Sequence, residues 1–140
     1  MTHYRSQIRA ALKLALQVNS HFAGFTLKSA WAQNIDAETL PVMGVATPRE
    51  TKDQDALDSA ERGITAIIVL KRLGGDDLEE VLDDDSVPVE NLGLATLRTL
   101  SFGAVLESTD IDIAGSAEQR IGTLTMVFRV VLSTPEPLTP

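Results

Sequence analysis

Residues 124–132 constrain the fold of this chain more than any other segment. Leu124, Met126, Phe128, Val130 and Leu132 alternate there with Thr125, Val127, Arg129 and Val131. A period of two is typical of a β-strand, because successive side chains point to opposite faces. The first set forms one wholly apolar face that suits packed helices, and the β-branched residues suit a pleated surface. We therefore predict a core strand of an antiparallel sheet.

Composition places the chain among ordinary globular proteins. It has 140 residues, of which 44% are hydrophobic and 23% charged, a length suited to a single hydrophobic core. The formal net charge of -8 argues against nucleic-acid binding, which depends on clustered Lys and Arg. The N-terminus lacks the apolar core of a signal peptide, and no stretch approaches the ~20 apolar residues of a membrane span. We expect an intracellular, soluble protein with one domain over residues 1–134 and a mobile proline-rich tail over residues 135–140.

Helical spacing marks two segments. Apolar residues recur along one face of residues 2–18, with Thr2 as a candidate N-cap and Asn19 or Ser20 as the end. A second helix is expected after Gly74-Gly75, where several acidic residues favour a helix N-terminus. Pro88 interrupts its apolar stripe, so two helical pieces or one kinked helix are expected, with Asp85 or Ser86 capping the second piece.

Further strands are expected on either side of these helices. Residues 42–47 form a short edge strand that Pro48 ends. Residues 64–73 are apolar on both faces, as in a central strand that helices cover on one side and a neighbouring subunit on the other. Residues 104–113 pair with 121–132 as a hairpin. Trp31 is interpreted as a core or edge-strand anchor. The fold class is α+β, with an antiparallel mixed-order sheet of four to five strands and both helices packed on one face.

Residues 49–61 are the longest polar stretch and separate two strand-like runs. We predict a long hairpin loop here. Loops of this length without structure of their own are either functional or disordered, and both alternatives stay open. If the segment is functional, its charged residues bind a neighbouring subunit or another partner. These candidate partner-binding residues are Arg49, Glu50, Lys52, Asp53, Asp55 and Asp58.

No motif for a reaction or a metal site is recognised. The absence of cysteine excludes thiolate chemistry and disulfides, and His3 and His21 are the only histidines. Asp110 and Asp112 resemble the start of a calcium loop, but Ile121 stands where that loop needs a bidentate Glu. Acid–base catalysis by paired Asp or Glu side chains stays open without geometry, although nothing indicates it. We expect no enzyme, no cofactor and no metal.

Four segments in order carry a resemblance to a known family. They are residues 5–16 (RSQIRAALKLAL), 40–45 (LPVMGV), 62–70 (RGITAIIVL) and 124–132 (LTMVFRVVL). Their order and spacing resemble those of the tail terminator proteins of long-tailed phages, and the likeness covers nearly the whole chain. Pro88 and the proline-rich tail depart from the family pattern.

The resemblance implies a structural virion protein rather than an enzyme. Such a subunit assembles into a hexameric ring that caps the tail tube, ends tube polymerisation and joins the tail to a head-completion or connector protein. Related rings occur in gene transfer agents and tail-like particles. The resemblance further implies that the protein is made in the host cytoplasm and lies in the neck region of the virion tail. It also implies that DNA passes through the ring without specific binding and that the protein contacts no membrane.

Three consecutive acidic residues suggest a role beside that DNA. Asp83, Asp84 and Asp85 are candidates for the wall of the ring's lumen, since carboxylates repel phosphates without binding them. The alternative is that they only solubilise an outer helix. Two other functions also stay open: another head–tail or tail-tube completion protein, and a small ligand-binding α+β domain.

Overall fold

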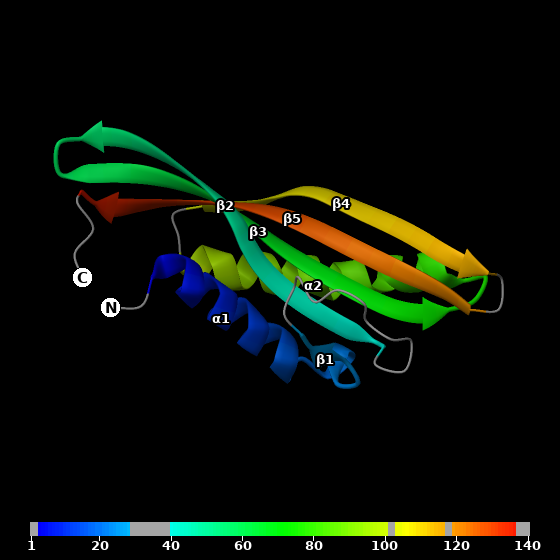
Figure 1. The fold of residues 1–140 in the computed structure, drawn as a ribbon. Helices are drawn as coiled ribbons and strands as arrows, with labels where there is room; N and C mark the ends of the chain where they lie inside the picture. The colour runs from blue at the N-terminus through cyan, green and yellow to red at the C-terminus, as the bar shows by residue number, and fades with distance from the viewer. Residues whose placement is uncertain (1–2, 29–39, 101–102, 117–118, 137–140) are drawn as a thin grey trace.

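The computed structural model describes residues 3–28, 40–100, 103–116 and 119–136 (Figure 1). Thr2, Trp31 and residues 137–140 lie outside this part of the chain, so the expectations for them are not addressed. The elements follow the chain in this order: α1 (Tyr4–Val18), the 3-10 helix η1 (Ser20–Phe22), β1 (Thr26–Leu27), β2 (Val42–Ala56), β3 (Ser59–Gly74), α2 (Leu78–Leu100), β4 (Gly103–Ser116) and β5 (Gln119–Pro135). His3 is the N-cap of α1, because its side chain accepts a hydrogen bond from the backbone N–H of Arg5.

Within the described residues, five strands form one sheet in the order β1-β2-β3-β5-β4. β1 pairs parallel with β2, and the remaining pairs are antiparallel. The helices α1 and α2 pack against each other on the same side of the sheet, here called the helix face (Figure 1). No described helix covers the opposite side, here called the open face. The predicted α+β class, with both helices on one face, is confirmed.

The alternation predicted for residues 124–132 is confirmed by the burial of β5. Met126, Phe128 and Val130 point to the helix face and are at most 1% exposed. Val127 and Val131 point to the open face and are half-buried, and Arg129 is exposed. The apolar residues of the central strand β3 alternate in the same way. One set is buried against the helices, and the set on the open face is only partly buried within the subunit.

Of the two alternatives predicted at Pro88, the division into two helical pieces is wrong, and a single helix is observed. α2 runs without a break through Pro88, and its buried residues keep helical spacing on both sides of it. Pro88 costs roughly 3 kcal/mol relative to alanine in a helix interior, and the continuous packing of α2 on the sheet outweighs that cost. Gly93 allows the close approach, since a Cβ atom there would lie 2.7 Å from the Phe128 ring.

The loop predicted for residues 49–61 is also wrong, because this segment is a β-hairpin with one register shift, between Gln54 and Ala56. β2 continues to Ala56 and β3 begins at Ser59, so the connection is a turn at Leu57 and Asp58. Pro48 does not end β2. It lies in an irregularity of the register on the strand's edge, beyond the short β1, where a missing N–H is tolerated.

The end of β5 completes this hairpin into a three-stranded arm. Ser59 pairs with Pro135, and the backbone N–H of Glu136 donates to the carbonyl oxygen of Asp58 at 2.8 Å. The boundary predicted at residue 134 is therefore too early, because these backbone groups fasten the start of the proline-rich tail. The arm comprises residues 51–62 and 132–135 and projects beyond the helices (Figure 1).

Candidate functional site

The six predicted partner-binding residues all lie on the arm or at its base, and the pleat divides them between the two faces. Glu50 and Lys52 belong to the helix face, where Lys52 forms an ion pair with Glu136. Arg49 and Asp53 belong to the open face by the register of β2 with β3. Asp55 accepts a hydrogen bond from Ser59, and Asp58 lies in the turn. These residues therefore form two different surfaces rather than one loop.

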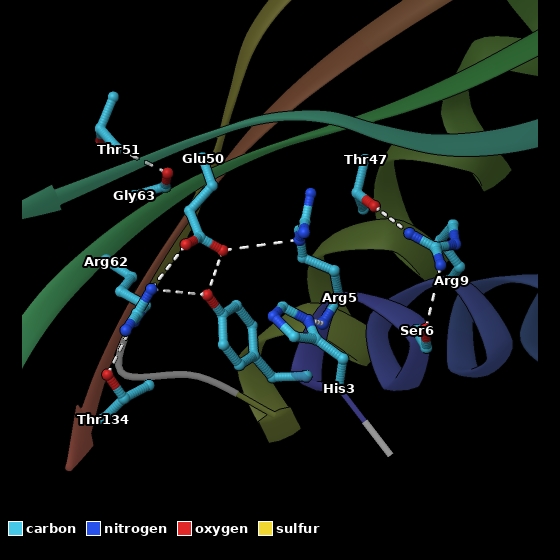
Figure 2. A network of polar contacts seen from close by, with 11 residues as sticks. His3, Arg5, Ser6, Arg9, Thr47, Glu50, Thr51, Arg62, Gly63 and Thr134 are labelled. Atoms are coloured by element: carbon cyan, nitrogen blue, oxygen red, sulfur yellow. Dashed lines mark hydrogen bonds and ion pairs between the residues drawn. The ribbon is translucent and has the colours of Figure 1, made fainter. Parts of the chain in front are cut away.

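On the helix face, a polar cluster joins the arm to α1. This arm-base cluster consists of Tyr4, Glu50, Arg62 and Thr134, of which Figure 2 labels the last three. Arg62 is only 7% exposed. Its Nε donates to Thr134 Oγ1 at 2.8 Å, and its Nη1 donates to Glu50 Oε2 at 2.6 Å and to the Tyr4 hydroxyl at 3.0 Å. The Tyr4 hydroxyl donates to Glu50 Oε1, and Arg5 lies 3.5 Å from that oxygen.

The protonation equilibria of this cluster are shifted. Burial, followed by the hydrogen bond to Glu50, raises the pKa of Tyr4 to about 12. Burial alone would raise the pKa of Glu50, but hydrogen bonds from Tyr4 and Arg62 outweigh it and the pKa is lowered. Burial would likewise lower the pKa of Arg62, and its bonds to Glu50 raise it instead. Tyr4 stays protonated and Glu50 ionised near neutral pH, so the cluster acts as a structural clamp.

On the open face, the base of the arm carries a hollow of about 240 Å³, here called the basic hollow. Its lining residues are Arg49, Thr51, Gly63, Ile64, Thr65, Glu107 and Arg129. Arg49 pairs with Thr65 across β2 and β3, and Thr65 pairs with Arg129 across β3 and β5, so the two arginines flank one threonine. Both arginines are exposed, and neither forms an ion pair with a described residue.

The basic hollow is chemically suited to an anion. Two guanidinium groups and the hydroxyl of Thr65 offer donors to a carboxylate or a phosphate, whereas the Thr51 hydroxyl already donates to the Gly63 carbonyl oxygen. Arg129, Thr65 and Glu107 are not among the predicted partner-binding residues, because only the strand register brings them beside Arg49. For Arg129, the alternation in the sequence already indicated that its side chain lies on the face opposite the apolar core. That alternation was the only sequence signal for its place in the hollow.

The acidic residues of α2 do not share one surface. Asp83 and Asp84 are exposed, but Asp85 is only 1% exposed and faces the sheet. The carboxylate of Asp85 lies 2.8 Å from Arg72 Nε and 2.8 Å from His21 Nε2, and Arg72 Nη2 donates to it at 2.9 Å. The expectation that Asp85 faces a lumen or caps a helix is wrong, because the helical rotation turns it inward.

Neither a metal-binding group of side chains nor a membrane-spanning helix is found among the described residues. In the described part of the chain, no three His, Asp or Glu side chains are grouped so that they could hold a metal ion. Asp110 and Asp112 lie on β4 opposite Thr125 and Thr123. None of the described helices is long and apolar enough to cross a membrane. Comparisons of the sequence with protein-family models and with curated proteins found no match.

Proposed function

We propose that this protein is the ring-forming tail terminator of a long-tailed phage or a related particle such as a gene transfer agent. One observation carries the proposal: the sheet is covered by helices on one face only. Ile67, Val69, Val127 and Val131 lie half-buried on the open face. Apolar side chains at the centre of a sheet favour contact with another protein. The sequence resemblance described above supplies the identity of that assembly.

The arm supports the same proposal by giving the subunit a second contact surface. A subunit whose projecting element meets a different patch on its neighbour makes a heterologous contact, and such contacts close into rings when the rotation permits. In the proposed role, a homohexameric ring caps the tail tube, stops its polymerisation and joins it to the head connector. The ring belongs to the neck of the virion tail and is built from subunits made in the host cytoplasm.

The exposed pair Asp83 and Asp84 fits a ring through which DNA passes without specific binding. Phosphates are repelled by carboxylates within about a Debye length, roughly 8 Å at physiological salt. DNA would slide past such a wall, whereas each Lys or Arg in its place would add a favourable phosphate contact. In the proposed ring these two residues face the lumen, and Asp85 serves the fold of the subunit.

A ligand-binding domain is the less favoured alternative. The basic hollow of about 240 Å³ is below the ~300–1,000 Å³ of most small-molecule sites, and it is open to solvent. Another head–tail or tail-tube completion protein would use the same surfaces. It differs from a terminator in one measurable respect, which is that it does not end the growth of the tube.

Tube growth therefore gives the decisive experiment. The purified protein is added to polymerising tube protein from the same genome, and tube lengths and end structures are recorded by electron microscopy. We expect shortened tubes capped by rings. Val127→Glu on the open face should abolish both ring and cap, whereas the control Val87→Glu, at a valine 59% exposed on α2, should abolish neither. A protein that leaves tube length unchanged is not a terminator.

A second measurement tests the lumen. Asp83→Lys combined with Asp84→Lys should leave ring assembly intact and impair DNA delivery by assembled particles. Glu79→Lys combined with Glu80→Lys changes the same exposed side of α2 one turn earlier, so it should impair delivery in the same way. Delivery that neither variant impairs would remove Asp83 and Asp84 from the proposed lumen.

A further inference from the structure

The open face carries two patches of opposite charge that have no partner within the subunit. The first is the basic hollow, where Arg49 and Arg129 outnumber the one carboxylate of the lining, Glu107. The second lies on the arm, where Asp53 and Glu61 stand directly opposite each other on β2 and β3. We infer that the Asp53–Glu61 pair of one subunit docks into the basic hollow of a second copy of this chain. This inference rests on the proposed ring and names the contact that would build it.

The acidic patch is unfavourable in the free subunit. Like charges directly opposite each other in an antiparallel pair destabilise it, and both side chains are exposed. Residues 53–61 contain four carboxylates and neither Lys nor Arg, and the two cations of the arm, Lys52 and Arg62, lie on the helix face, where they pair with Glu136 and Glu50. Leu57, at the tip, is 94% exposed, which adds an apolar contact for a partner. An arm with this composition fits a basic surface that also offers apolar side chains.

The basic hollow offers that surface. Arg49 and Arg129 are separated by one strand, so their backbones lie about 10 Å apart, and a pair of carboxylates fits between them. The hydroxyl of Thr65 adds a neutral donor. Val131 and Val127, half-buried on either side of Arg129 along β5, supply the apolar border.

The arm of a subunit cannot fill its own hollow. Asp53 follows Arg49 by four residues on the same strand, which places it roughly 13 Å away, and the tip at Leu57 lies roughly 26 Å away. The strands of the arm are paired throughout, so the arm does not fold back. A contact between the two patches is therefore intermolecular.

Charge exchange tests the contact. The hollow variant carries Arg49→Glu and Arg129→Glu, and the arm variant carries Asp53→Lys and Glu61→Lys. Each should self-associate about tenfold or more weakly than the wild type, measured by sedimentation velocity, because it now opposes like charges. An equimolar mixture should assemble again, since each variant's arm then matches the other's hollow. The control Lys13→Glu with Lys28→Glu, at side chains without a described ion pair, should assemble as the wild type does.

The outcomes separate this inference from the proposed function. Rings that form equally well in both variants would overturn the docking contact and leave the ring proposal standing. Variants that fail alone and also fail when mixed would overturn it too, provided that circular dichroism and thermal melting show folded proteins. A symmetric dimer that obeys the charge exchange would support the contact and contradict the ring. A wild-type protein that stays monomeric at all concentrations tested, free and with tube protein, would overturn both.

Discussion

The two faces of the sheet differ in whether their charged side chains have partners within the subunit. On the helix face, each buried charged group has a partner inside the subunit: Arg62 meets Glu50, and Asp85 meets Arg72. On the open face, Arg49 and Arg129 have no ion pair with a described residue, and Asp53 faces Glu61. Buried charges are costly unless paired, whereas exposed ones are tolerated without a partner. Folding therefore pairs the charges of the helix face, whereas the charges of the open face stay unpaired in the free subunit.

The largest expected difference between the faces concerns two adjacent residues of β5. Phe128→Ala should lower the free energy of unfolding by about 3–5 kcal/mol, because it leaves a cavity between the sheet and α2. Val127→Ala should lower it by only about 1 kcal/mol, since part of that side chain already meets solvent in the free subunit. Urea unfolding of the isolated subunit measures both. Equal losses would mean that the open face is packed within the subunit after all.

A second contrast concerns the neighbouring acids of α2. Asp85→Ala should destabilise the subunit by about 3 kcal/mol, because it leaves Arg72 and its buried surroundings without a counter-charge. This expected loss lies at the lower end of the roughly 3–5 kcal/mol that breaking a buried ion pair costs, because the Arg72 side chain is 24% exposed. Asp84→Ala should change stability by no more than about 0.5 kcal/mol. Thermal and urea unfolding measure the stability of both variants. If both lose equally little, the ion pair between Asp85 and Arg72 does not stabilise the fold.

The sequence contained enough information for the fold class and the helix face, but not for the arm or the sites. The alternation around Phe128 specified the helix face correctly, because burial and pleat follow one period. The polarity of residues 49–61 pointed to a loop, yet these residues form strands, because backbone pairing with the end of β5 stabilises a hairpin whose side chains face water. Pro88 pointed to a break that tertiary packing overrides.

The sites depend on register, which local sequence does not give. Arg62 and Tyr4 are 58 residues apart, and nothing local to either predicts that they meet at Glu50. Arg49 and Arg129 become neighbours only through their pairing with Thr65. The Asp83–Asp85 run is a similar case, because its exposed and buried members can be told apart only once the phase of α2 on the sheet is known.

The arm-base cluster should make stability depend on pH at both extremes. The pKa of Glu50 is lowered in the folded state, so its contribution is present above the unfolded value near 4.5 and is lost as pH falls through the folded value. The pKa of Tyr4 is raised from 10.0 to about 12, so its contribution is present below pH 10.0 and is lost as pH rises toward 12.

Two variants test the two limbs of that profile in urea unfolding. Glu50→Gln should flatten the acidic limb. Tyr4→Phe should flatten the alkaline limb and also weaken the acidic limb, because the hydrogen bond from Tyr4 is among the contacts that lower the pKa of Glu50. Both variants are also expected to be less stable than the wild type at neutral pH, because each removes a partner of buried Arg62. If the limbs keep their slopes in these variants, the pH dependence of stability arises from other groups.

The smallest expected effect is a gain, and it reports on the open face directly. Asp53→Asn keeps the size of the side chain and removes its charge from the position opposite Glu61. Relief of that repulsion should raise the free energy of unfolding of the isolated subunit by about 0.2–0.5 kcal/mol, within the range of cross-strand pair effects, and the gain should fade at high salt. Asp58→Asn in the turn removes the same charge without a directly opposite acid, so it should give a smaller gain.

If docking neutralises Asp53, the same Asp53→Asn change should weaken self-association. A substitution that stabilises the subunit and weakens the assembly would identify a charge retained for a partner, whereas a loss in both would place Asp53 among the residues that hold the arm together.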